Sequence, residues 1–145
     1  MKALVTGGGG FLGRAMVRGL LENGAGVRSF SRSEHAGLRA LDVEQASGDV
    51  ADAAAISAAV RGCDAVFHVA ARAGIWGSYA EYHQANVTGT RNVIAACRQH
   101  AVARLIYTSS PSVIFDGRDL EGVDESVPYP IHYEAHYPRT KAVAE

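Results

Sequence analysis

Two groups of residues in this chain have the types and spacing to do chemistry. The first is a run of glycines, residues 7–10, which directly follows an apolar stretch and is followed in turn by Gly13. Glycines let a phosphate approach the backbone closely, and free N–H groups at the start of a helix attract its charge. Gly7, Gly10 and Gly13 fit one glycine spacing, and Gly8, Gly10 and Gly13 fit another. Both registers predict a site for a dinucleotide pyrophosphate.

The second group is a serine, a tyrosine and a lysine. Tyr137 and Lys141 are four residues apart, so they share one face of a helix. A free phenol has a pKa near ~10, and a neighbouring ammonium makes it a better acid and base at neutral pH. Lys2 and Lys141 are the only lysines among 14 basic residues, which indicates that arginine would not serve at position 141. Ser110 follows a predicted strand and could face a substrate carbonyl, but Thr108 shares its face, so spacing alone leaves the choice open.

The end of the second apolar run bears on which dinucleotide binds. An acidic residue there would hold the ribose hydroxyls of NAD, whereas an arginine beside a small polar residue suits the 2′-phosphate of NADP. Ser31 followed by Arg32 favours NADP, and NAD stays possible because Glu34 is close enough to act as the acid. Asp49 follows the third run and is placed either to meet the adenine or to cap a helix.

Positioning these groups requires strands that end at one edge. Apolar runs alternate with helical patterns along the chain. Strands are expected at residues 2–6, 27–31, 45–50, 65–70 and 104–108. Helices are expected at 11–23, 33–41, 53–60 and 82–100, and from Tyr137 onward. Such alternation predicts an α/β doubly wound parallel sheet, the Rossmann fold, whose strands bind ligands at their carboxyl ends.

Composition excludes several other classes of function. The chain has 145 residues, 48% of them hydrophobic and 20% charged, with a net charge of -1, so nothing indicates a nucleic-acid partner. No apolar run approaches the roughly 18 residues of a membrane span. Cys63 and Cys97 are expected to be small core residues in a reducing cytoplasm. His132 and His136 have metal-binding spacing but no third ligand nearby, and His68 is expected to be a hydrogen-bonded core histidine.

With these motifs in order, the chain resembles the extended short-chain dehydrogenase/reductase family, within the NAD-dependent epimerase/dehydratase superfamily. The resemblance covers essentially all 145 residues. It is carried by residues 6–13 (TGGGGFLG), 48–50 (GDV), 66–71 (VFHVAA), 86–90 (NVTGT) and 107–110 (YTSS), and by Tyr137 with Lys141. Residues 73–79 (AGIWGSY) and 109–117 (SSPSVIFDG) are similar to the 3β-hydroxysteroid dehydrogenase-like branch.

The resemblance implies roles for individual residues. Ser110 would orient the substrate carbonyl, Tyr137 would donate or accept the proton, and Lys141 would bind the nicotinamide ribose and tune Tyr137. Asn86 would carry a water-linked proton path as a fourth catalytic residue. The cofactor-binding residues would be Gly7, Gly10, Phe11, Leu12, Gly13, Ser31, Arg32, Asp49, Val50, Ala70, Ala71 and Lys141.

The function implied is hydride transfer between NADP(H), with NAD possible, and a secondary alcohol or ketone. The substrate would be a hydrophobic small molecule with a 3-hydroxy or 3-oxo group, such as a 3-oxoalkanoate or a steroid. Trp76, Tyr79 and Tyr82 are expected either to line its cleft or to anchor a loop. The alternatives are a sugar-nucleotide epimerase or dehydratase, and a non-enzymatic NAD(P)-sensing protein. The chain is expected to be the dinucleotide-binding domain, residues 1–145, of a longer homodimeric enzyme whose substrate-binding part is absent.

Overall fold

The structure, a computed structural model that describes residues 1–145, is built on a five-stranded parallel sheet. The strand order is β3-β2-β1-β4-β5. The strands are β1 (Lys2–Thr6), β2 (Gly26–Ser31), β3 (Glu44–Ser47), β4 (Ala65–His68) and β5 (Arg104–Tyr107). The order reverses direction at β1, so β1 and β4 flank the point where a doubly wound sheet opens a ligand crevice. The predicted fold class is confirmed.

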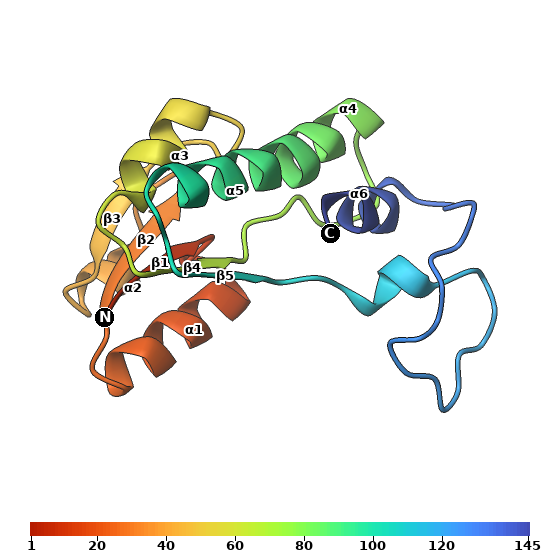
Figure 1. The fold of residues 1–145 in the computed structure, drawn as a ribbon, viewed down its shortest axis with the longest axis horizontal. Helices are drawn as coiled ribbons and strands as arrows, with labels where there is room; N and C mark the ends of the chain where they lie inside the picture. The colour runs from red at the N-terminus through yellow and green to blue at the C-terminus, as the bar shows by residue number, and fades with distance from the viewer.

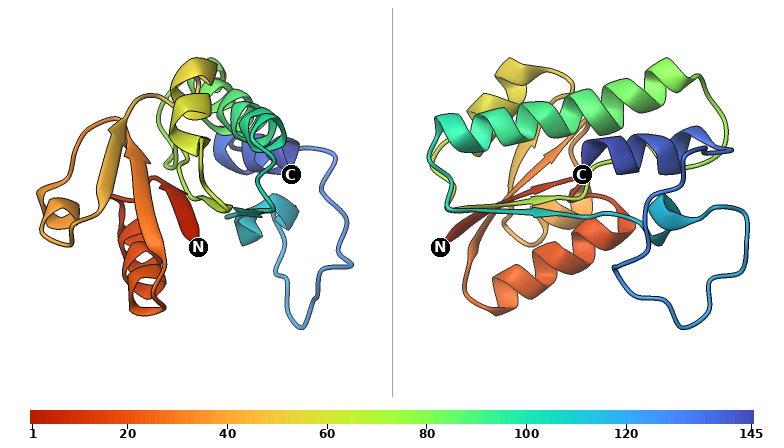
Figure 2. Two further views of the ribbon diagram at one scale, coloured as in Figure 1. Left: turned by 60° about the vertical axis from the view of Figure 1, so that its left-hand side comes forward. Right: turned by 45° about the vertical axis from the view of Figure 1, so that its right-hand side comes forward.

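Helices cover both faces of the sheet (Figures 1 and 2). One face carries α1 and the other carries α3 and α5, while α6 lies beside the α4 end of the long helix. The helices are α1 (Phe11–Glu22), α2 (Ala36–Arg39), α3 (Ala53–Val60), α4 (Tyr79–Tyr82), the π-helical η1 (His83–Thr88), α5 (Gly89–Gln99), the 3-10 helix η2 (Pro111–Ile114) and α6 (His136–Ala144). None of these helices has the combination of length and hydrophobicity that a membrane span needs.

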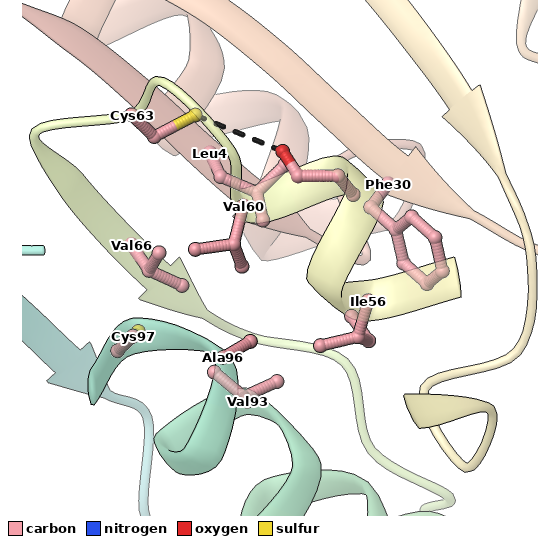
Figure 3. Packing of buried hydrophobic residues seen from close by; sticks show 10 residues of the cluster. Leu4, Phe30, Ile56, Val60, Cys63, Val66, Val93, Ala96 and Cys97 are labelled. Atoms are coloured by element: carbon pink, nitrogen blue, oxygen red, sulfur yellow. Dashed lines mark hydrogen bonds between the residues drawn. The ribbon is translucent and has the colours of Figure 1, made fainter. Parts of the chain in front are cut away.

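Strand alternation divides the buried side chains between the two faces. Leu4 packs toward α3 and α5 in a cluster with Phe30 and Val66, shown in Figure 3. The next residue, Val5, belongs to the opposite cluster with Val17 of α1. Because successive side chains of a strand point to opposite faces, the neighbouring apolar residues Leu4 and Val5 of β1 contribute to the two cores in turn.

The register aligns the carboxyl ends of four strands. Thr6 pairs with Phe30 on one side and with His68 on the other, and His68 pairs with Tyr107. The residues that follow this row therefore lie at one edge of the sheet. That edge is where the glycine turn, Ser31 and Ser110 were expected to meet.

Several element boundaries differ from the sequence-based expectations. The fourth strand ends at His68 rather than at residue 70, because the N–H groups of Val69 and Ala70 donate to Thr6 Oγ1 instead of a neighbouring strand. The third strand is Glu44–Ser47 and the helix expected at 33–41 is reduced to Ala36–Arg39. The helix expected at 82–100 begins at Tyr79.

Candidate functional site

A cleft of about 620 Å³ opens at the carboxyl edge of the sheet. Eleven of the twelve residues expected to bind cofactor line it, and Lys141 does not. These eleven are Gly7, Gly10, Phe11, Leu12, Gly13, Ser31, Arg32, Asp49, Val50, Ala70 and Ala71. They come from four separate segments of the chain, which the parallel register brings to one place.

The backbone of the glycine cluster distinguishes the two possible spacings. Gly7 has a φ of 70°, the left-handed region that favours glycine. A Cβ on Gly13 would lie 2.1 Å from the Gly7 carbonyl oxygen, so α1 can approach β1 only with glycine there. Gly8 and Gly9 are buried beneath Ser29 and His35 and do not line the cleft. The geometry favours glycines 7, 10 and 13 as the ligand-facing set.

The start of α1 and the end of β2 offer polar groups to a ligand. No side chain caps α1 at Gly10, so its first-turn N–H groups are free to hold an anion. The Ser31 hydroxyl is buried on the cleft wall and has no hydrogen-bond partner. A bound ribose or phosphate would give this hydroxyl a hydrogen-bond partner. A cleft that contains both this hydroxyl and a glycine turn fits a dinucleotide.

Asp49 and Glu34, the acidic residues that the sequence offers for contacts with the adenosine of the dinucleotide, have different surroundings. Asp49 lines the cleft, and its Oδ1 accepts from the Ala51 N–H at 2.9 Å. The helix cap is Asp52, which accepts from the first turn of α3. Glu34 forms an ion pair with Arg39 and does not line the cleft, which leaves Arg32 as the charged side chain at the end of β2.

The long helix that carries Asn86 is shaped by its own sequence. Its N-terminus at Tyr79 follows from a capping box, in which Ser78 accepts from the Glu81 N–H and Glu81 accepts from the Ser78 N–H. The π-helical turn then places Asn86 in mid-helix. There the Thr90 hydroxyl donates to the Asn86 carbonyl at 2.6 Å, and a side chain entering the helical ladder is a recognised cause of such a distortion.

A buried hydrogen-bond chain connects the glycine turn to this π-helical turn. Thr6 Oγ1 accepts from both the Val69 and Ala70 N–H groups at 3.1 Å, so its own proton must go to His68 Nδ1 at 2.7 Å. His68 Nε2 therefore carries a proton and donates to Thr90 Oγ1 at 3.0 Å. His68 is neutral in this arrangement, and burial lowers its pKa to about 4. The expectation of a hydrogen-bonded core histidine is confirmed.

Asn86 joins the cleft wall to the helix that bears the tyrosine and lysine. Its Oδ1 accepts from the Arg72 N–H at 2.7 Å, and its Nδ2 donates to the Arg72 carbonyl at 3.1 Å. The same Nδ2 donates to Thr140 Oγ1 at 2.9 Å. Thr140 lies between Tyr137 and Lys141 in α6, so one buried amide fixes α6 against the cleft.

The Lys141 side chain is buried away from solvent, which is unusual for a charged group. It is 3% exposed, donates from Nζ to the Thr108 carbonyl at 2.6 Å and lies 4.0 Å from the centroid of the Tyr107 ring. Desolvation lowers the pKa of Lys141 to about 8, which leaves it mainly charged at neutral pH. Ser110 caps η2, and its hydroxyl bonds to that of Ser112 at 2.8 Å. Thr108, the alternative to Ser110 on the same strand face, accepts the Lys141 hydrogen bond through its backbone carbonyl.

The sequence interpretation missed several cleft residues. They are Phe30, Ser33, His35, Gly48, Val69, Arg72, Glu81, Gln84 and Ala85. The capping box at Ser78 was a readable signal for Glu81, since it places the helix start three residues earlier. The aromatic residues that were expected to line the substrate cleft or anchor a loop differ in burial: Tyr82 is buried, whereas Trp76 is 84% exposed.

Comparisons with known proteins identify relatives of this chain. A model of the 3-beta hydroxysteroid dehydrogenase/isomerase family matches residues 4–145. A 2-alkyl-3-oxoalkanoate reductase of Stenotrophomonas maltophilia is 55% identical over all of this chain and 44% of its own length. A 3 beta-hydroxysteroid dehydrogenase/Delta 5-->4-isomerase of Mycobacterium tuberculosis is 40% identical over 99% of this chain and 41% of its own length.

The same fold occurs in solved structures. A short-chain dehydrogenase/reductase superfamily protein of Agrobacterium tumefaciens with bound NAD superposes with a TM-score of 0.87 at 30% identity, covering 99% of this chain and 43% of that one. The chain spans less than half the length of each of these proteins.

Proposed function

Because the chain belongs to the 3-beta hydroxysteroid dehydrogenase/isomerase family, we propose that it provides the dinucleotide site and the acid–base residues of an oxidoreductase. The reaction interconverts a hydroxyl and a ketone on a hydrophobic substrate, of the 3-oxoalkanoate or steroid class. The observation that carries this proposal is the Asn86 amide, which bonds both to the cleft wall at Arg72 and to Thr140 beside Tyr137 and Lys141.

The cleft residues would hold a nicotinamide dinucleotide, which supplies or accepts the hydride when bound. The α1 N-terminus and the glycine turn would bind its pyrophosphate, and Ser31 and Arg32 its adenosine ribose. In the reductive direction, Tyr137 donates its phenolic proton to the carbonyl oxygen as the alcohol forms. The Lys141 ammonium stabilises the resulting phenolate, and the Ser110 hydroxyl orients the carbonyl.

Replacing the acid–base residue tests this role. In the protein at its natural length, Tyr137→Phe is expected to lower kcat at least ~10²-fold, because the proton donor is lost while binding surfaces remain. Dinucleotide affinity, measured by calorimetry, should be nearly unchanged. Tyr129→Phe, which removes an exposed phenol, is the matched control and should retain activity. Full turnover by Tyr137→Phe would remove Tyr137 from the mechanism.

We further propose NADP(H) as the preferred dinucleotide, since Arg32 lines the cleft next to the unpartnered Ser31 hydroxyl. Arg32→Ala should weaken binding of NADPH and leave that of NADH unchanged. Calorimetric titration of both dinucleotides decides the matter. Tenfold tighter binding of NADH, a difference of roughly 1.4 kcal/mol, would contradict the preference.

A further inference from the structure

Arg72 is the second cationic side chain on the cleft wall, and neither the sequence motifs nor the proposed mechanism gives it a task. It follows β4 and lines the cleft together with Ala71 and Glu81. Its backbone is clamped on both sides by the Asn86 side chain, at 2.7 Å and 3.1 Å. These two bonds fix the backbone of Arg72 at the cleft wall.

The guanidinium has more donors than the protein satisfies. Its Nη2 donates to the Trp76 carbonyl at 3.3 Å, and its Nε is buried without any partner. Glu81 pairs with the same Nη2 through Oε1 at 3.5 Å, while its other oxygen, Oε2, accepts from the N–H and hydroxyl of Ser78 at 2.7 Å and 3.1 Å. A guanidinium carries five N–H donors in a planar fork that matches an oxyanion. Arg72 therefore has free donors of the kind that bind a carboxylate.

The surroundings of Arg72 suit an acid with an apolar chain. The guanidinium lies 5.2 Å from the centroid of the Tyr82 ring, and that ring lies 5.9 Å from the ring of His136, the residue before Tyr137. On the nearby loop Ile75 and Trp76 are 78% and 84% exposed. An anion on Arg72 would thus lie near the loop that carries Trp76 and near the Tyr82 ring, which contacts the helix that bears the acid–base tyrosine.

We propose that Arg72 is the receptor for the carboxylate of a hydrophobic 3-oxo or 3-hydroxy acid, with the alkyl chain of the acid against Ile75 and Trp76. This assignment rests on the proposed function and narrows its substrate class from 3-oxoalkanoates or steroids to acids alone. The dinucleotide pyrophosphate offers the same oxyanion chemistry, so the experiment must separate the two.

The test compares an acid with its ester in the protein at its natural length. For Arg72→Met we expect KM for a 2-alkyl-3-oxo acid to rise roughly 30-fold, the range of a charge-assisted hydrogen bond, with kcat/KM for the methyl ester within about twofold. Arg72→Lys should recover part of the loss, because it restores the charge without the planar fork. Arg139→Met is the matched control: Arg139 stacks on Tyr79 at 4.7 Å but does not line the cleft.

Two binding measurements complete the test. NADPH affinity, followed by fluorescence titration, should be the same in Arg72→Met and the unmodified protein; a loss equal to that seen with the acid would make the pyrophosphate the ligand and overturn the proposal. Equal losses on acid and ester would overturn it as well. Calorimetric titration of a non-reducible long-chain alkanoate onto the NADPH-bound protein should show the same roughly 30-fold dependence on Arg72. That result without turnover of any ketone would sustain the carboxylate site and refute the reductase.

Discussion

The hydrogen-bond chain through His68 makes a quantitative prediction for Thr90→Val. This substitution keeps the shape of the side chain and removes the hydroxyl that accepts from His68 Nε2 and donates to the Asn86 carbonyl. Thr90 and His68 are 3% and 1% exposed, so water cannot replace the lost partner. Leaving a buried donor unsatisfied costs about 1–3 kcal/mol, and the Asn86 carbonyl loses a partner too. We expect the free energy of unfolding to fall by about 3 kcal/mol.

Thr90→Ser is the matched control, since it keeps the hydroxyl and loses one methyl group. That change is expected to cost about 1 kcal/mol. Urea unfolding followed by circular dichroism measures both variants under the same conditions. An equal loss of unfolding free energy in Thr90→Val and Thr90→Ser would refute the hydrogen-bond chain through His68. Nitrogen-15 spectroscopy of His68 gives an independent check, because a proton found on Nδ1 at neutral pH would contradict the directions assigned to its bonds.

Two further predictions follow from buried groups near the site. The pKa of His68 is about 4 in the folded protein and near 6.5 in the unfolded one, so the unfolded state binds more protons between these pH values. The free energy of unfolding, measured by urea titration, should therefore fall by up to about 3 kcal/mol from pH 7 toward pH 4. If His68→Gln showed the same dependence of this free energy on pH, His68 would not be its cause. Gly13→Ala should abolish dinucleotide binding in calorimetry, because the new Cβ would lie 2.1 Å from the Gly7 carbonyl oxygen. Gly19→Ala is the control in the same helix: a Cβ there would have no atom within 4 Å, so this variant should bind the dinucleotide normally. Equal binding by the two variants would contradict the close approach of α1 to β1.

Local features of this chain could be predicted from the sequence because their causes are local. The glycine turn, the cap at Asp52 and the left-handed glycines at positions 24 and 62 depend on a few neighbouring residues. The alternation of apolar strands with helices was enough to predict a parallel sheet, because only covered faces allow strands that are apolar on both sides.

The tertiary structure decided what depends on contacts between distant segments. Gly7, with a φ of 70°, lines the cleft whereas Gly8 is buried against Ser29, and this arrangement favours glycines 7, 10 and 13 over the alternative spacing. The tertiary structure also ended β4 at His68, because Thr6 captures the next two N–H groups. The family resemblance pointed to Asn86, but only the packed fold shows its amide bonded to both Arg72 and Thr140. Arg72 carried no sequence signal, since its cleft position and its unpartnered Nε arise from the packing of the chain around it.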